Sequence, residues 1–106
     1  MAVWKVEESL NILVSALCLD YKRRQRAIRE RMVTPRTDTE FRYYNFKIFD
    51  AAAEIVGEGL AEIYIEEIGM HTGYAKSSVD YISETTYKKY KKLICENIAK
   101  KLHLCD

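Results

Sequence analysis

Lysines and small hydroxyl residues gather between Gly73 and Lys92, in the stretch GYAKSSVDYISETTYKKYKK. Lysine ammonium groups and serine or threonine hydroxyls bind phosphate oxygens and base edges, so this composition indicates contact with nucleic acid. Helix N-termini within the stretch would add to such contacts, because their free backbone amides favour phosphate. The residues that we expect to contact DNA are Lys76, Ser77, Ser78, Thr85, Thr86, Lys88, Lys89 and Lys92.

Two starting points are open for the helix that would face DNA. If Gly73 forms the turn of a helix-turn-helix, the second helix begins near Ala75, and Gly69 lets the two helices cross closely. If Ser83 is the N-cap instead, the stretch GMHTGYAKSSVDYI becomes a long connecting loop and the motif is partly lost. We assign the helix-turn-helix-like region to about residues 65–102.

This region resembles a known family. GYAKSSVDYI, followed by SETTYKKYKKLICENIAKKL, is similar to the C-terminal helix-turn-helix of phage-encoded late transcriptional regulators of the ArpU and RinA type. Those segments in turn are similar to the DNA-binding end of sigma factors. The stretch LDYKRRQRAI near Tyr21 is reminiscent of their N-terminal helix. The resemblance implies a small regulator of transcription, of phage or prophage origin, that binds duplex DNA.

Charge is sorted along the chain, although the net charge is only +1. Residues 22–36 are mainly basic, residues 50–70 carry acids without a base, and residues 88–101 are rich in lysine. A partner responds to this local charge rather than to the total. Additional phosphate contacts are expected from Arg23, Arg24 and Arg26 if acidic side chains do not pair with them.

Four glutamates recur every fourth residue in the acidic segment, namely Glu54, Glu58, Glu62 and Glu66. This spacing places them on one helix face, where like charges repel and favour a positive partner. The explanation that we favour is pairing with the arginines of RRQRAIRER. The alternative is an exposed acidic face that docks on a basic site of another protein.

Catalysis finds little support in the residue pattern. We find neither a triad-like pattern nor a glycine-rich phosphate loop, and no four-ligand metal spacing. We therefore expect a protein that is not an enzyme, with no metal and no cofactor.

The three cysteines, Cys18, Cys95 and Cys105, are odd in number and unpaired in spacing, which predicts free thiols. With neither a secretory leader nor a membrane span in the pattern, we expect a cytoplasmic location.

Apolar spacing predicts three long helices in a single domain of residues 1–106, an all-α small helical bundle. The first should run from Val6 to Met32, ahead of the loop VTPRTDTE. The second should begin at Asp38 or Thr39 and continue to Ile68, with Gly57 and Gly59 in its middle. We interpret these glycines as a point of close helix contact, and a kink is the other interpretation.

The third helix should follow Ser83 as its N-cap, and only FRYYNFKIF has enough aromatic residues to compete as a strand. One apolar stripe from each helix should form a common core. The expected core residues are Leu13, Leu17, Tyr21, Val56, Leu60, Ile63, Ile94 and Ile98.

Two functions follow from these features. The first is a DNA-binding protein without catalysis, a regulator of transcription whose partner is duplex DNA. The second is a small phage-type protein that binds and inhibits a host protein through a charged face, for example a nuclease of a defence system. An exposed, continuous acidic face favours the second function, and a ladder covered by arginines, with free lysines on the third helix, favours the first.

Overall fold

The computed structural model describes the backbone of residues 3–104 and the side chains of residues 8–104. In that part of the chain every regular element is helical, which confirms the all-α prediction. The stretch FRYYNFKIF lies inside a helix rather than a strand. The elements are α1 (Val3–Leu19), α2 (Tyr21–Arg29), α3 (Pro35–Val56), α4 (Glu58–Gly69), the short 3-10 helix η1 (Tyr74–Lys76) and α5 (Glu84–Lys101).

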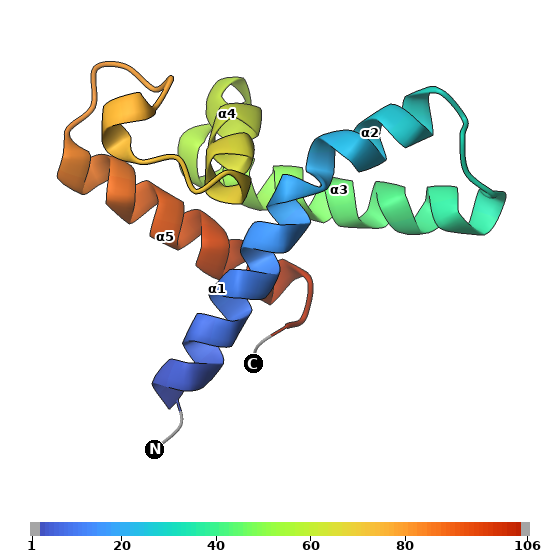
Figure 1. Cartoon of the computed structure of the whole chain (residues 1–106), viewed down its shortest axis with the longest axis horizontal. Coiled ribbons are helices and arrows are strands. Elements are labelled where there is room, and N and C mark those ends of the chain that lie inside the picture. The colour runs from blue at the N-terminus through green and yellow to red at the C-terminus, as the bar shows by residue number, and fades with distance from the viewer. Residues whose placement is uncertain (1–2, 105–106) are drawn as a thin grey trace.

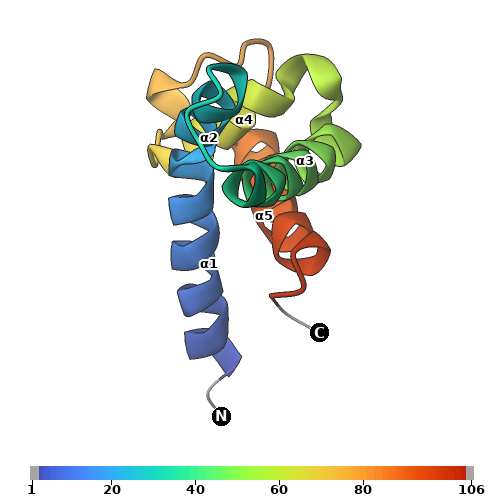
Figure 2. The ribbon, with the colours of Figure 1, turned by 90° about the vertical axis from the view of Figure 1, so that its right-hand side faces the viewer.

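Helix α3 is the axis of the bundle (Figure 1). Its first half packs against α2, and the rest of the bundle is built from its contacts with α4 and α5. Helix α1 crosses α4 and also touches α5, so α5 contacts both α3 and α1. The N-terminal half of α1 projects away from the other helices, as two perpendicular views show (Figures 1 and 2). None of the helices in residues 3–104 has the length and apolar character that crossing a membrane requires.

The single first helix predicted from Val6 to Met32 is wrong, because the chain breaks at Asp20 between α1 and α2. The Asp20 carboxylate accepts hydrogen bonds from Arg23 and Arg24 in the first turn of α2. Asp20 keeps helical dihedral angles, φ −87° and ψ −2°, and its side chain makes no hydrogen bond to the backbone at the start of α2, so it is not an N-cap. The buried stripe of Val14 and Cys18 continues to Tyr21 across this break, and α2 then runs along the first half of α3.

The second predicted helix is also divided. Thr34, not Asp38 or Thr39, caps α3, because its Oγ1 accepts from the Thr37 backbone amide and Pro35 is tolerated at the first helical position. At Gly57 the backbone has φ +86°, which ends α3 and starts α4. The favoured interpretation as close helix contact is therefore wrong for this pair of glycines: open space surrounds the position of a Cβ at either Gly57 or Gly59.

Helix α5 matches its prediction. The Ser83 side chain accepts a hydrogen bond from the backbone amide of Thr86, as an N-cap does. Its inward residues recur at three- and four-residue steps, with Tyr87, Ile94 and Ile98 fully buried and Tyr90 half-buried.

The buried residues differ from the predicted ones because each helix turns a different face to the core than expected. Leu13 and Leu60 are 42% and 39% exposed, and Leu17, Val56 and Ile63 only flank the core. The division at Gly57 rotates α4 relative to α3, so one stripe cannot pass through both. Alanines also allow close packing that a pattern of large apolar residues does not reveal. The residues buried in place of those expected are Val14, Ile48, Ala51, Ala52, Ala61, Tyr64, Ile65 and Ile68.

A buried arginine joins α2 to its neighbours. Arg24 is only 3% exposed, and its Nε donates to Asn45 Oδ1 on α3 over 2.7 Å. Its Nη2 donates to the Leu17 carbonyl of α1 over 2.6 Å, while Asn45 donates to the Tyr21 carbonyl. Each nitrogen of the guanidinium has a hydrogen-bond partner, so Arg24 holds α1, α2 and α3 together at their junction.

Candidate nucleic-acid interface

The segment between α4 and α5 is a long loop. Helix α4 ends at Gly69, α5 begins at Glu84, and only η1 interrupts the irregular backbone between them. A helix-turn-helix joins its helices by a turn of about three or four residues. The helix expected to begin near Ala75 is therefore absent, and the alternative start at Ser83 is the one observed. Gly69 does permit a close crossing, but the partner is α1, whose Leu19 backbone nitrogen lies 2.5 Å from the position of a Cβ.

A buried carboxylate holds this loop in place. Glu67 of α4 is 6% exposed and accepts from the Ser77 hydroxyl over 2.6 Å and from the Ser78 backbone amide over 2.7 Å. The Tyr87 hydroxyl of α5 donates to the same carboxylate over 2.6 Å. Burial alone would raise the pKa of Glu67, but these three hydrogen bonds, together with nearby Lys91, lower it below its ordinary value. The loop is thus tied to both helices through one charge.

Aromatic rings complete the support for the loop. The Tyr74 ring lies 5.8 Å from that of Tyr87, and the Tyr74 hydroxyl donates to the Ile82 carbonyl. Lys91 donates to the Thr72 carbonyl over 2.7 Å, and its ammonium lies 5.1 Å from the centre of the Tyr87 ring. Burial is the main cause that lowers the pKa of Lys91. This lysine therefore supports the loop and is separate from the exposed lysines around it.

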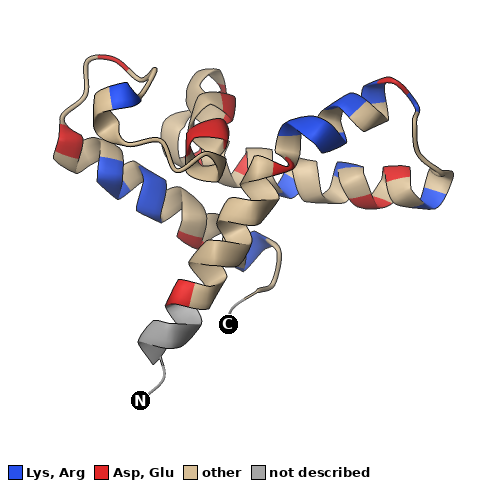
Figure 3. Ribbon diagram, viewed as in Figure 1, with Lys and Arg blue, Asp and Glu red and all other residues tan. Residues whose placement is uncertain are grey.

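Four residues on the first half of α5 share its outer face: Thr85, Lys88, Lys89 and Lys92. Their spacing of three and four residues places them on one side of the helix, away from the buried stripe. All four are exposed, and so is Lys76 on η1, which contacts α5. We call Lys76, Lys88, Lys89 and Lys92 the lysine face. Figure 3 shows basic positions on η1 and on the neighbouring turns of α5.

The four residues of the lysine face differ in whether they form an ion pair. Lys88 pairs with Glu84 over 2.7 Å. Among the described side chains no carboxylate forms an ion pair with Lys76, Lys89 or Lys92. These three ammonium groups are the ones that can meet an anionic partner at no cost to an existing pair.

The hydroxyl residues expected at the interface divide into two groups. Ser77 is half-buried and donates to Glu67, and Thr86 is half-buried with its amide and hydroxyl turned to Ser83. Ser78 and Thr85 are exposed beside the lysine face. At this surface only α5 is long enough to offer N-terminal backbone amides to a phosphate, because η1 is a single short turn.

The arginines of α2 are already engaged. Arg24 is buried, as described above, and its side chain is out of reach of phosphate. Arg23 binds the Asp20 carboxylate through both Nε and Nη2, and Arg26 pairs with Glu30 over 3.3 Å. Each exposed pair joins residues three or four positions apart and contributes little to stability.

The acidic ladder does not meet these arginines, so that favoured explanation is wrong. Glu66 pairs with Lys22 over 3.0 Å and Glu62 accepts from Gln25 over 3.0 Å. Glu54 lies on α3, beyond the break, and binds Lys101 and Asn97 of α5. All four glutamates, Glu58 included, are exposed. The ladder is therefore an acidic surface that the break at Gly57 interrupts, and Glu54, Glu62 and Glu66 each bind separate partners.

The sequence analysis did not identify Glu67, and it assigned Arg24 to phosphate contact although this side chain is buried. A signal was present for both, since Glu67 follows Tyr64 by three residues and Arg24 follows Tyr21 by three, each in phase with a buried aromatic residue. A charge on an apolar stripe indicates a buried group whose hydrogen bonds are satisfied.

Comparisons of the chain with protein-family models, curated proteins and solved structures found no match.

Proposed function

We propose that this protein binds duplex DNA, without catalysis, through the lysine face and the exposed hydroxyls of Ser78 and Thr85. The observation that carries the proposal is the alignment of Lys88, Lys89 and Lys92 on the outer face of α5, beside Lys76 on η1. Phosphate contacts by lysine supply affinity that does not depend on sequence.

Anchoring of the loop supports this proposal. Because Glu67 binds Ser77, Ser78 and Tyr87 together, the backbone that carries Lys76 is held against the same helix as the other lysines. A surface that is ordered before binding loses less conformational entropy when it meets its partner. On the sequence resemblance to phage late regulators alone, since a long loop stands where a helix-turn-helix has its turn, we propose control of transcription as the role of this binding.

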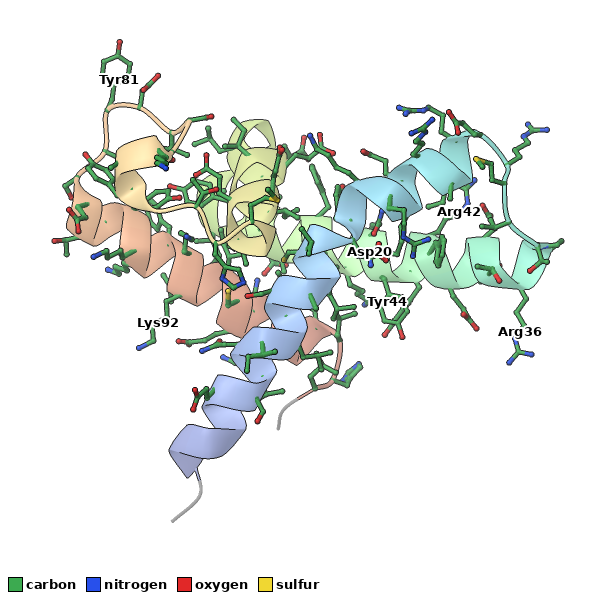
Figure 4. All side chains as sticks on the ribbon, in the orientation of Figure 1. Asp20, Arg36, Arg42, Tyr44, Tyr81 and Lys92 are labelled. Atoms are coloured by element: carbon green, nitrogen blue, oxygen red, sulfur yellow. The ribbon has the colours of Figure 1, made fainter. Side chains whose placement is uncertain are left out.

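Lys89 and Lys92 provide the sharpest test. In fluorescence anisotropy with a random-sequence duplex, replacing both by glutamine should reduce the slope of log affinity against log salt by about two, because each lysine neutralises one phosphate. The matched control is Arg36→Gln with Arg42→Gln, which removes the same charge from the opposite end of the molecule (Figure 4). The control should bind like the wild type.

Each other outcome is informative. Equal weakening in the two double variants would mean that only total charge matters and would contradict the assigned surface. Weaker binding by the arginine variant alone would move the interface to the first half of α3. Absence of any affinity for duplex DNA at low salt would end the DNA proposal.

Inhibition of a host protein is the second candidate. The observation in its favour is the exposure of Glu54, Glu58, Glu62 and Glu66, together with the absence of arginine among their partners in the described part of the chain. A basic partner surface could dock on α4, where Lys22 and Gln25 would have to release their glutamates. Binding to a basic partner protein that Glu58→Gln with Glu62→Gln abolishes, without any binding to duplex DNA, would support this function.

A further inference from the structure

Positive charge is concentrated at the end of the molecule formed by α2 and α3. We call residues 20–49 the α2–α3 arm, which comprises α2, the loop after it and the first half of α3, and which extends away from α5 (Figure 1). The arm holds nine basic and four acidic residues, a charge of +5, so the rest of a chain of net charge +1 carries −4. Figure 3 shows basic positions on both helices of the arm. This end of the molecule therefore attracts an anionic partner.

A groove of about 490 Å³ lies between the two helices of the arm. Its apolar lining comes from Ile28 of α2 and from Phe46 and Phe49 of α3. Ile28 and Phe49 are half-buried, whereas Phe46 is 66% exposed, so a large aromatic ring stands free beside the groove. The volume is in the range of sites that bury a ligand or the side chains of a partner.

The two ends of the groove differ in charge. Arg29 and Arg42 line it near the loop that joins the helices. Arg42 pairs with Asp38 over 2.7 Å, while none of the described carboxylates forms an ion pair with Arg29. Toward α4 the lining residue Gln25 donates to the carboxylate of Glu62 over 3.0 Å. One end therefore attracts acidic groups, and the other end adjoins an acid of the protein itself.

We propose that this groove binds an acidic segment of a partner protein. The segment places an apolar side chain against Phe46 and its carboxylates against Arg29 and Arg42. Guanidinium groups bind carboxylates through two parallel hydrogen bonds, and Arg29 can do so at no cost to an existing ion pair. Aromatic and arginine side chains at the centre of an interface supply most of its affinity.

The charge difference along the groove favours a protein segment over a strand of nucleic acid. Every nucleotide carries a phosphate, so a strand along the whole groove would bring negative charge to Glu62. A protein segment can confine its acids to the end that meets the arginines. Bases could nevertheless stack on Phe46, which makes single-stranded nucleic acid the alternative to measure. The proposal is independent of duplex binding by the lysine face, which lies at the other end of the molecule.

Fluorescence anisotropy of the whole chain with three labelled synthetic peptides of about fourteen residues tests the proposal. The first peptide has aspartates in one half and a leucine and a phenylalanine at its centre, and it is made in both chain directions. The second has asparagines in place of the aspartates, and the third has serines in place of the apolar residues. The first peptide, in one of its directions, should bind at least about tenfold more tightly than the other two.

Two variants of the groove and two matched controls locate the binding. Phe46→Ala and Arg29→Gln should each weaken binding of the first peptide at least about tenfold. The controls are Tyr44→Ala and Arg36→Gln, whose exposed side chains lie on the side of α3 that faces away from α2 (Figure 4). Both controls should bind the peptide like the wild type. All four side chains are exposed, so all four variants should fold, which circular dichroism verifies.

Absence of binding by the first peptide up to about 1 mM protein overturns the proposal. So does equally tight binding of the peptide without aspartates or of the peptide without apolar residues. Equal weakening by the control variants would show that the groove is not the site. A labelled oligothymidylate is measured with the same proteins. If it binds more tightly than the first peptide, and Phe46→Ala and Arg29→Gln weaken it, the groove belongs to single-stranded nucleic acid and the proposal is wrong.

Discussion

Glu67 carries its charge at a position that the apolar spacing of α4 assigns to the core. Its three hydrogen-bond donors come from the loop and from α5, so the carboxylate joins three segments that are otherwise distant in sequence. A buried carboxylate with several donors is favoured in its ionised form, which is why its pKa is low despite burial.

Replacing Glu67 by glutamine should lower the free energy of unfolding by about 1–3 kcal/mol, because three donors lose a charged acceptor. Glu66→Gln is the control, since Glu66 is an exposed neighbour whose single ion pair with Lys22 contributes little. Urea unfolding at neutral pH measures both. A decrease for Glu67→Gln no greater than that for Glu66→Gln would show that the carboxylate does not hold the loop.

The pH dependence of stability should report the same group. Because the folded state lowers the pKa of Glu67, its contribution is complete above the ordinary pKa of a glutamate and is lost as pH falls through the folded value. Between neutral pH and about pH 3, the wild type should therefore lose more stability than Glu67→Gln. Parallel curves for the two proteins would contradict this assignment.

Residue types in this site could be predicted from the sequence, but their partners could not. Lys89 and Lys92 are exposed as their charge and spacing indicate, whereas Ser77 and Thr86 have the same composition signal and face inward. The difference depends on Glu67, ten residues before Ser77, and on the path of a loop that local spacing does not describe. Hydroxyl residues serve loops and interfaces equally well.

At the scale of elements, the glycines of α4 have opposite roles. A Cβ at Gly69 would lie 2.5 Å from the Leu19 nitrogen and 2.6 Å from its Cα, so α1 and α4 cross there at backbone distance. At Gly59, inside the same helix, the Cβ would meet nothing within 4 Å. The contrast shows which glycine sets the spacing of the two helices.

Gly69→Ala should therefore destabilise the protein by about 1–3 kcal/mol, since backbone atoms must move apart. Gly59→Ala should be neutral or stabilise by up to about 1 kcal/mol, because alanine lowers the entropy of the unfolded chain and fits a helix. Thermal unfolding of the two variants checks the pair. Equal effects would mean that the close crossing of α1 and α4 is absent in solution.

Element positions were predictable only in part. The cap at Ser83 and the course of α5 follow from local chemistry that is visible in the sequence, whereas the cap of α3 was expected at Asp38 or Thr39 and is Thr34. The breaks at Asp20 and Gly57 are weaker local signals, and each is decided by where the following helix finds its packing partner.

For the molecule as a whole, the core is centred on the meeting of α3, α4 and α5. Ile94 and Ile98 are fully buried there, as the spacing of α5 predicts. Leu60 belongs to the exposed side of α4 at 39% exposure. The break at Gly57 rotates the buried face of α4 relative to that of α3. A single apolar stripe drawn through both helices therefore assigns Leu60 to the core, although it is exposed.

Truncation of Ile94 to alanine should cost about 2–5 kcal/mol, whereas Leu60→Ala should cost well under about 2 kcal/mol because its side chain covers little buried apolar area. Chemical denaturation of both variants, with the wild type as reference, shows which face of α4 is buried. A destabilisation by Leu60→Ala as large as that of Ile94→Ala would place Leu60 in the core after all.

The position of α5 has a consequence for biosynthesis. Helices α1 to α4 leave the ribosome first, yet the apolar surfaces of α3 and α1 that α5 covers stay open until residues 84–101 have emerged. Until then the nascent chain exposes the surfaces that Ile94 and Ile98 will cover, the kind of apolar surface on which chaperones act. Completion of the core during translation is thus timed by the emergence of α5.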